Sequence, residues 1–226
     1  PNIAWDRRPE QAANTNPQVV ATLIRLCFEA GAKKVKVGDH TCDTARRSYA
    51  TSGIAKVAKE AGAEVVYVDK RRFREISIKG ERLKTLWIYP EMIECDVMIN
   101  AAIAKHHVLA GLTLCMKNYM GVVDKRRQYH QDIPTCLCDL TRYMKPRTPL
   151  FVLDCVRVLL RHGPKGGNLA DVAQRFTLAA GVDPVAIDAF GAEVMGRKPS
   201  AIGSIAAGEK AKLGTMNYRS LQIKEV

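Results

Sequence analysis

The first 70 residues alternate between helical and extended patterns, and this alternation most limits the folds open to the chain. Asn16-Pro17 begins an amphipathic segment whose apolar side chains share one face, as expected of a helix start. Residues 34–39 favour a short strand, residues 44–62 a helix interrupted near Gly53, and residues 64–69 a second strand. This order is typical of α/β proteins built around a mostly parallel sheet.

The rest of the chain continues with both element types. Residues 70–90 read as antiparallel and exposed, because Ile76-Ser77-Ile78 alternates before a turn at Lys79-Gly80. Later buried strands are expected at 96–102, 149–154 and 175–180, and helices at 111–119, 134–144, 183–196 and 199–213. No linker or internal repeat interrupts them. We therefore expect one α/β domain over 1–226, with a mostly parallel sheet flanked by helices.

Charge composition favours an anionic partner. The 226 residues carry a net charge of +12, with cationic clusters at 46–47, 70–72 and 125–127. Aromatic residues make up only 6% and no recognition motif appears, which disfavours nucleic acid. No apolar run is long enough to span a membrane. The chain starts at Pro1 without Met or signal segment, so we expect a fragment of a longer precursor.

The most informative polar residues surround the predicted strand 96–102. Lys105, His106 and His107 follow it, and Lys117-Asn118 lies in the next predicted helix. Ligands of open α/β sheets bind beyond the carboxyl ends of the strands. The sequence therefore predicts a binding pocket there, with these five residues as its candidates.

Lys117 stands out because its predicted helix is apolar on nearly all sides, as in buried helices. A buried ammonium costs several kcal/mol unless it is paired. Several interpretations remain open: an anionic ligand, backbone carbonyls, an internal ion pair with Asp39, Asp154 or Asp188, or a side chain that reaches water along an apolar surface.

Histidine is the side chain best suited to proton transfer near neutral pH. Neighbours in an extended segment point to opposite sides, so we expect only one of His106 and His107 to face the pocket. His107 is the candidate proton carrier and His40 a second base. His130 follows the basic cluster 125–127, and we expect that loop to close over the site.

Three further features are candidates for ligand binding. The backbone of Gly166 and Gly167, in a glycine-rich loop, is suited to close approach to an anion, although a tight turn explains these glycines equally well. Asp154 ends a buried strand, and Asp188 lies one turn inside an apolar helix, where its burial requires a partner.

The seven cysteines form no recognisable framework. Several lie in apolar runs and read as small buried hydrophobic residues. Cys136 and Cys138 are the one close pair, and they are the candidates if the chain holds a metal, although no second pair lies at zinc spacing.

Four blocks of the chain together resemble the family catalogued as domain of unknown function 362. These are D-V-M-I-N-A-A-I-A-K-H-H, L-T-L-C-M-K-N-Y-M-G-V, H-G-P-K-G-G-N and D-P-V-A-I-D-A. The resemblance implies a further opening strand before Pro1, which this chain lacks. It also implies twin-arginine export to the cell envelope or periplasm; without that signal the location would be the cytoplasm.

A more distant similarity links the K-H-H…K pattern to the N-terminal domain of lactate racemase. That similarity implies proton transfer by His107 and cofactor binding by Lys117, and it remains an analogy of fold.

We thus expect an enzyme or ligand-binding protein with a Lys/His anion pocket, acting by proton transfer on a carboxylate- or phosphate-bearing small molecule. A metal or iron–sulfur-linked redox protein is the first alternative, and a polyanion- or nucleic-acid-binding module the second. The sequence identifies no cofactor, reaction class or oligomeric state.

Overall fold

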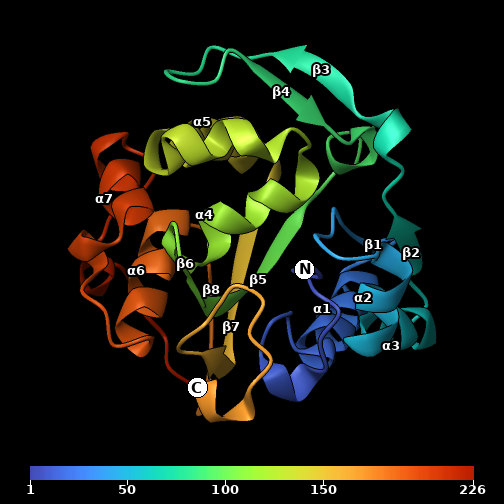
Figure 1. Cartoon of the computed structure of the whole chain (residues 1–226). Coiled ribbons are helices and arrows are strands. Elements are labelled where there is room, and N and C mark those ends of the chain that lie inside the picture. The colour runs from blue at the N-terminus through green and yellow to red at the C-terminus, as the bar shows by residue number, and fades with distance from the viewer.

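The N-terminal part of the computed structural model, which describes all residues 1–226, is built on a parallel pair of strands (Figure 1). Its elements are α1 (Pro17–Glu29), β1 (Lys36–Asp39), α2 (Ala45–Thr51), α3 (Ile54–Glu60) and β2 (Glu64–Tyr67). Gly53, with a φ of 74°, separates α2 from α3 at the predicted interruption. Val20 and Ile24 of α1 pack with Val37, Tyr49 and Ile54 in a small core of their own. The parallel order predicted for this region is confirmed.

A separate antiparallel hairpin follows, as the alternating pattern of residues 70–90 predicts. It consists of β3 (Arg74–Ser77) and β4 (Thr85–Ile88), and Figure 1 shows it at the top of the molecule.

The largest sheet has four strands and is mixed, so the predicted mostly parallel sheet is wrong. Its order is β6-β5-β7-β8, and only β5 and β7 run parallel. The strands are β5 (Ile99–His107), β6 (Gly111–Thr113), β7 (Leu150–Leu159) and β8 (Val172–Gly181). The reversals have local causes. A three-residue turn after His107 returns the chain as β6, and residues 160–171 return it antiparallel to β7 as β8.

Four helices pack together beside this sheet (Figure 1). They are α4 (Cys115–Asn118), α5 (Ile133–Met144), α6 (Pro184–Val194) and α7 (Gly203–Lys210). Short 3-10 segments complete the chain: Pro9–Gln11, Lys70–Arg72, Pro90–Met92, Tyr119–Val122, Arg126–Gln131, Lys145–Arg147, Leu169–Asp171, Pro199–Ala201 and Tyr218–Ser220. The helix predicted at 111–119 is therefore shorter, because its first residues pair as β6. None of the helices has the length and apolar character needed to cross a bilayer.

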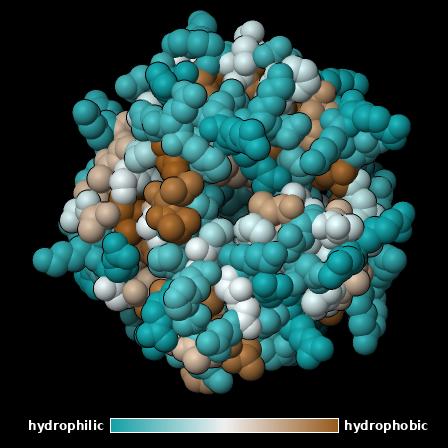
Figure 2. Space-filling model, viewed as in Figure 1, coloured by the Kyte–Doolittle hydropathy of each residue, from teal (hydrophilic) through white to brown (hydrophobic).

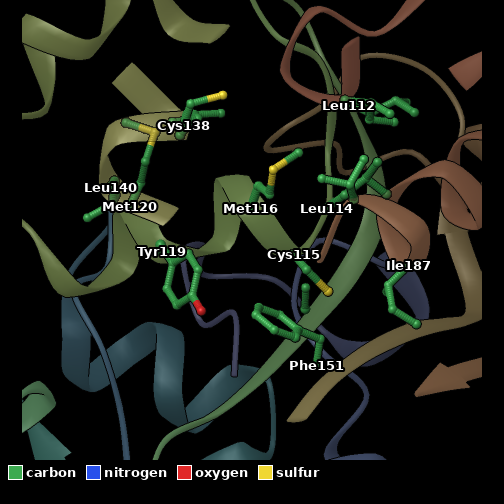
Figure 3. Packing of buried hydrophobic residues seen from close by; sticks show 14 of the residues in the cluster. Leu112, Leu114, Cys115, Met116, Tyr119, Met120, Cys138, Leu140, Phe151 and Ile187 are labelled. Atoms are coloured by element: carbon green, nitrogen blue, oxygen red, sulfur yellow. The ribbon is translucent and has the colours of Figure 1, made fainter. Parts of the chain in front are cut away.

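The main core surrounds α4. Cys115, Phe151 and Ile187 lie close together on one side of it, and Met120 lies beside Cys138 on another (Figure 3). All five belong to one cluster of 32 buried residues. The position of α4 is thus fixed by packing on several sides, which matters because this helix carries Lys117.

The N-terminal segment joins the two parts of the molecule. The backbone N–H of Ile3 donates to Asp39 in β1, and that of Asn16 donates to Asp154 in β7. The hydroxyl of Thr15 donates to the carbonyl of Ala101 in β5. From these buried hydrogen bonds we infer that the chain forms one domain.

Candidate functional site

Lys117 projects from a helix whose start is held by a buried carboxylate. Asp188, 1% exposed, accepts the backbone N–H groups of Cys115 at 2.7 Å and Met116 at 3.1 Å. These are the first amides of α4, which have no partner within a helix. The burial of Asp188 is therefore explained by the backbone of α4, and it does not pair with Lys117.

The Nζ of Lys117 has no oxygen partner in the protein. Its one polar contact is the Sδ of Met120 at 3.5 Å, and no acidic side chain lies within 4.0 Å. Asp39 and Asp154 are likewise engaged with backbone amides. The internal ion pair considered from the sequence is therefore absent, and a partly buried ammonium is left without a counter-charge.

A chain of amide side chains runs beside Lys117. Asn118 donates to the Oδ1 of Asn100 and accepts from the Nδ2 of Asn2, both at 2.9 Å. Asn100 in turn donates to the carbonyl of Cys115 at 2.9 Å. Asn118 thus fixes the end of α4 to β5 and to the N-terminal segment, which makes it a positioning residue.

Lys105 is the most deeply buried cation of the site, at 1% exposure. Its Nζ donates to the Oδ1 of Asn2 at 2.9 Å and to the carbonyl of Ala13. Burial, together with the positive charge of Lys117, lowers the pKa of Lys105 to about 7. Two neutral acceptors therefore hold an amine whose charge is easily lost.

The pKa of Lys117 is lowered as well, to about 8, chiefly by burial and also by the charge of Arg126. A charge on the sulfur of Cys42 would act in the opposite direction on both lysines. One electrostatic group is therefore formed by Lys105, Lys117, Arg126 and Cys42, which come from four separate parts of the chain.

The two adjacent histidines lie within β5 rather than in a loop after it, and they have different surroundings. The Nδ1 of His106 accepts the N–H of Gly163 at 3.1 Å. The Nδ1 of His107 accepts the N–H groups of Leu109 and Ala110 at 3.2 and 3.1 Å, so its Nε2 carries the proton. Burial and the nearby lysines lower the pKa of His107 to about 3.

The loop after α4 reaches the same region. Arg126 donates from Nη2 to the carbonyls of His40 at 2.8 Å and Thr41 at 3.0 Å, and from Nη1 to the Sγ of Cys42 at 3.4 Å. These contacts of Arg126 hold the loop against the end of β1.

A cavity of about 300 Å³ opens next to this group. It is lined by the segment from Asp39 to Ala45, with Val68 and Lys70, at the carboxyl ends of β1 and β2. Figure 2 shows the surface hollowed near its centre, in the region between α4 and β1 of Figure 1. Cys42 lines the cavity and its Sγ accepts from Arg126 at 3.4 Å, so it links the cavity to the cationic group, whereas neither Lys105 nor Lys117 lines the cavity.

His40 lines the same cavity with one ring nitrogen fixed. Its Nδ1 lies 2.8 Å from the carbonyl of Val123, which can only accept, so Nδ1 carries the proton and Nε2 a free lone pair. Burial, together with the charge of Arg126, lowers the pKa of His40. The ring is thus a neutral base at physiological pH.

The remaining predicted residues lie apart from the lysines. Asp154 accepts the N–H groups of Asn16 at 2.7 Å and Val156 at 3.0 Å. Gly166 and Gly167 offer their carbonyls to Arg7 and Gln11, and both have positive φ. These glycines fit the tight-turn interpretation.

Cys136 and Cys138 are two residues apart in α5, and both are buried in the main core. Burial raises the pKa of each thiol to about 11, so both are protonated at neutral pH. No group of three His, Cys, Asp or Glu side chains is arranged to hold a metal ion. These two thiols do not contribute to the lysine site.

Sequence reasoning missed Cys42, Asn2 and Asn100 as parts of the site, and it named Arg126 only as a member of the basic cluster 125–127. A polar Asn100 within an otherwise apolar strand was the clearest available signal. Cys42 gave none, since only the fold brings the end of β1 against the loop after α4.

Comparison with known proteins supports the resemblance seen in the motifs. A family model described as Domain of unknown function (DUF362) matches residues 1–193. The chain belongs to the DUF362 family. It is also similar to the thylakoid-associated protein sll1697 of Synechocystis sp., at 25% identity over 222 residues, which cover 94% of this chain and 67% of that relative. The family match includes both lysines, both β5 histidines and Asp188.

Proposed function

We propose that this DUF362 protein binds a small carboxylate- or phosphate-bearing molecule at Lys117, as an enzyme or as a ligand-binding protein. The observation that supports this most strongly is the Nζ of Lys117, which has only a thioether contact in the protein. An ammonium removed from water without a counter-charge costs several kcal/mol. An anionic ligand would supply the missing partner.

The surroundings favour the same kind of ligand. Lys105 and Arg126 add positive charge near Lys117, and the Nε2–H of His107 is a further donor. Asp39, whose charge acts on Lys105, is buried, which raises its pKa and weakens it as a competing anion. Concentrated positive charge with low-dielectric walls attracts small anions.

The proton-transfer part of the proposal now rests on different groups. His107 acts as a hydrogen-bond donor, because an imidazole with a pKa of about 3 does not carry a second proton at neutral pH. His40 is the proposed base through its free Nε2. Lys117, with a pKa of about 8, is the group able to give and take a proton near neutrality.

The two alternatives have less support. The redox or metal alternative relied on Cys136 and Cys138, which are enclosed in the core. The polyanion alternative relied on clusters such as residues 70–72, where Arg71 pairs with Asp69 and Arg72 with Glu91. Location in the cell envelope or the cytoplasm stays a prediction; the name of the Synechocystis relative associates that protein with thylakoids.

Calorimetric titration with inorganic phosphate and with succinate tests the proposal. We expect binding that is lost in Lys117→Met and kept in Lys56→Met, whose side chain is 78% exposed on α3. Equal binding by both variants would show that general surface charge holds these anions.

A further inference from the structure

We propose that Lys117 forms an imine with the carbonyl carbon of a 2-oxo acid whose carboxylate is held by the neighbouring cations. This inference rests on the proposed function and names its substrate class. It follows from the placement of one free amine among groups that recognise a carboxylate.

The first support is that the lone pair of Lys117 is unobstructed. A lysine whose Nζ donates to carbonyl or carboxylate oxygens is held as an ammonium, whereas Lys117 contacts only the Sδ of Met120. Lys105 differs, since its Nζ is occupied by Asn2 and Ala13 and is 1% exposed. Lys117 is therefore the amine available for reaction.

The second support is the rigidity of its attachment. Asp188 holds the first amides of α4, and Asn118, the next residue, is bonded to Asn2 and Asn100. Covalent chemistry gains from a nucleophile held in place, because less orientational freedom is lost on reaction.

The third support is the charge around the amine. Arg126 lowers the pKa of Lys117 beyond the effect of burial, a charged Cys42 would raise it, and Lys105 and His107 lie in the same group. Desolvation and cationic neighbours are the means by which proteins keep a lysine nucleophilic. The same cations suit a carboxylate, and Cys42, whose Sγ accepts from Arg126, lines a cavity of about 300 Å³ that has room for a short oxo acid.

The reaction balances with groups at hand. The neutral Nζ attacks the carbonyl carbon, forming the N–C bond while the C=O π pair moves to oxygen, and one N–H proton is transferred from the nitrogen to that oxygen. The carbinolamine then breaks its C–O bond as the nitrogen lone pair forms the C=N bond, and the second N–H proton goes to the departing hydroxide, which leaves as water. Amine and ketone give imine and water, with no oxidant or reductant. Protonation of the imine acidifies the adjacent C–H, which links this step to the proposed proton transfer.

Reductive trapping tests the inference. The full chain is incubated with pyruvate and sodium cyanoborohydride, and intact mass and peptide mapping locate the secondary amine. We expect one adduct, on Lys117, formed at least about tenfold faster than on exposed Lys56 because more of the Lys117 amine is neutral near pH 7. Excess phosphate is expected to slow it, and succinate, which has no ketone, to give none.

Lys117→Arg separates this inference from anion binding, because it keeps the positive charge but cannot form an imine. We expect it to bind phosphate and to lose the adduct, with its melting temperature showing that it is folded. Phosphate binding by the natural protein without an adduct at Lys117 would overturn the imine alone. Adducts on Lys105, or spread evenly over surface lysines, would overturn it too. Absence of both binding and adduct would overturn both proposals.

Discussion

Replacing Lys117 by Met should stabilise the protein while removing the proposed anion binding. Met has nearly the length and volume of Lys and would extend the contact with Met120, without an ammonium to desolvate. A gain in stability is unusual for a core substitution, since most destabilise by about 0.5–3 kcal/mol. It is expected here because the natural residue carries an unpaired charge.

The magnitude follows from the pKa. The pKa of Lys117 falls from 10.5 to about 8 in the folded protein. At about 1.4 kcal/mol per pH unit, this shift corresponds to about 3 kcal/mol in the free energy of unfolding. Partial exposure reduces this, so we expect a gain of about 1–3 kcal/mol near neutral pH. The ammonium disfavours folding fully below pH 8, less between pH 8 and 10.5, and not above. The advantage of the Met variant should therefore shrink as pH rises through that window.

Urea denaturation of both proteins at about pH 7 and pH 10, at constant ionic strength, measures the difference in unfolding free energy. Arg126, Cys42, Lys105 and His107 are common to both proteins, so the difference reports Lys117 together with its effect on the pKa values of Lys105 and His107. Lys56→Met is the control and should change little, because its side chain is 78% exposed. A Lys117→Met variant less stable than the natural protein at pH 7, or a difference independent of pH, would refute the reasoning.

Other predictions concern the frame of the site. Asp188→Asn should lower the free energy of unfolding by about 1–3 kcal/mol in urea denaturation, because one of the N–H groups of Cys115 and Met116 loses its acceptor. An unchanged denaturation midpoint would contradict the capping role of Asp188. Gly121→Ala should lower the free energy of unfolding by about 1–3 kcal/mol, because the added Cβ would lie 1.9 Å from the Oδ1 of Asp39. A variant as stable as the natural protein would show that the surrounding structure accommodates this contact. His107 should keep its proton on Nε2 in nitrogen NMR spectra from about pH 5 to 8, and a titration near 6.5 would place it outside the lysine group.

Local elements were predictable because their signals lie next to them in the sequence. Asp183 accepts from the N–H groups of Val185 and Ala186 at the start of α6, as the Asp-Pro pair predicts. Strand direction was not predictable in the same way. The chain reverses between β5 and β6 through a short turn, and β6 begins at Gly111, which has a φ of 75°. The sequence from Gly111 onward predicts a helix, so the reversal was not expected.

The candidate site was predictable in part. The apolar surroundings of Lys117 indicated a cation removed from water, and the structure shows no ion pair between Lys117 and Asp39, Asp154 or Asp188. The anionic ligand stays a prediction. Asp188 could not be assigned, since the amides that it holds lie 73 and 72 residues away. The contact between Arg126 and Cys42 could not be predicted for the same reason, since these residues lie 84 positions apart in the sequence.

The most direct test of the account is the titration of the Lys117 amine itself. Lysine-selective carbon and nitrogen NMR, with Lys117→Arg to assign the resonance, gives its pKa in the free protein and with inorganic phosphate. The account predicts a pKa of about 8 in the free protein and a clear rise on adding phosphate. A value near 10.5 that phosphate does not move would contradict the claim that Lys117 is an unpaired cation awaiting an anion.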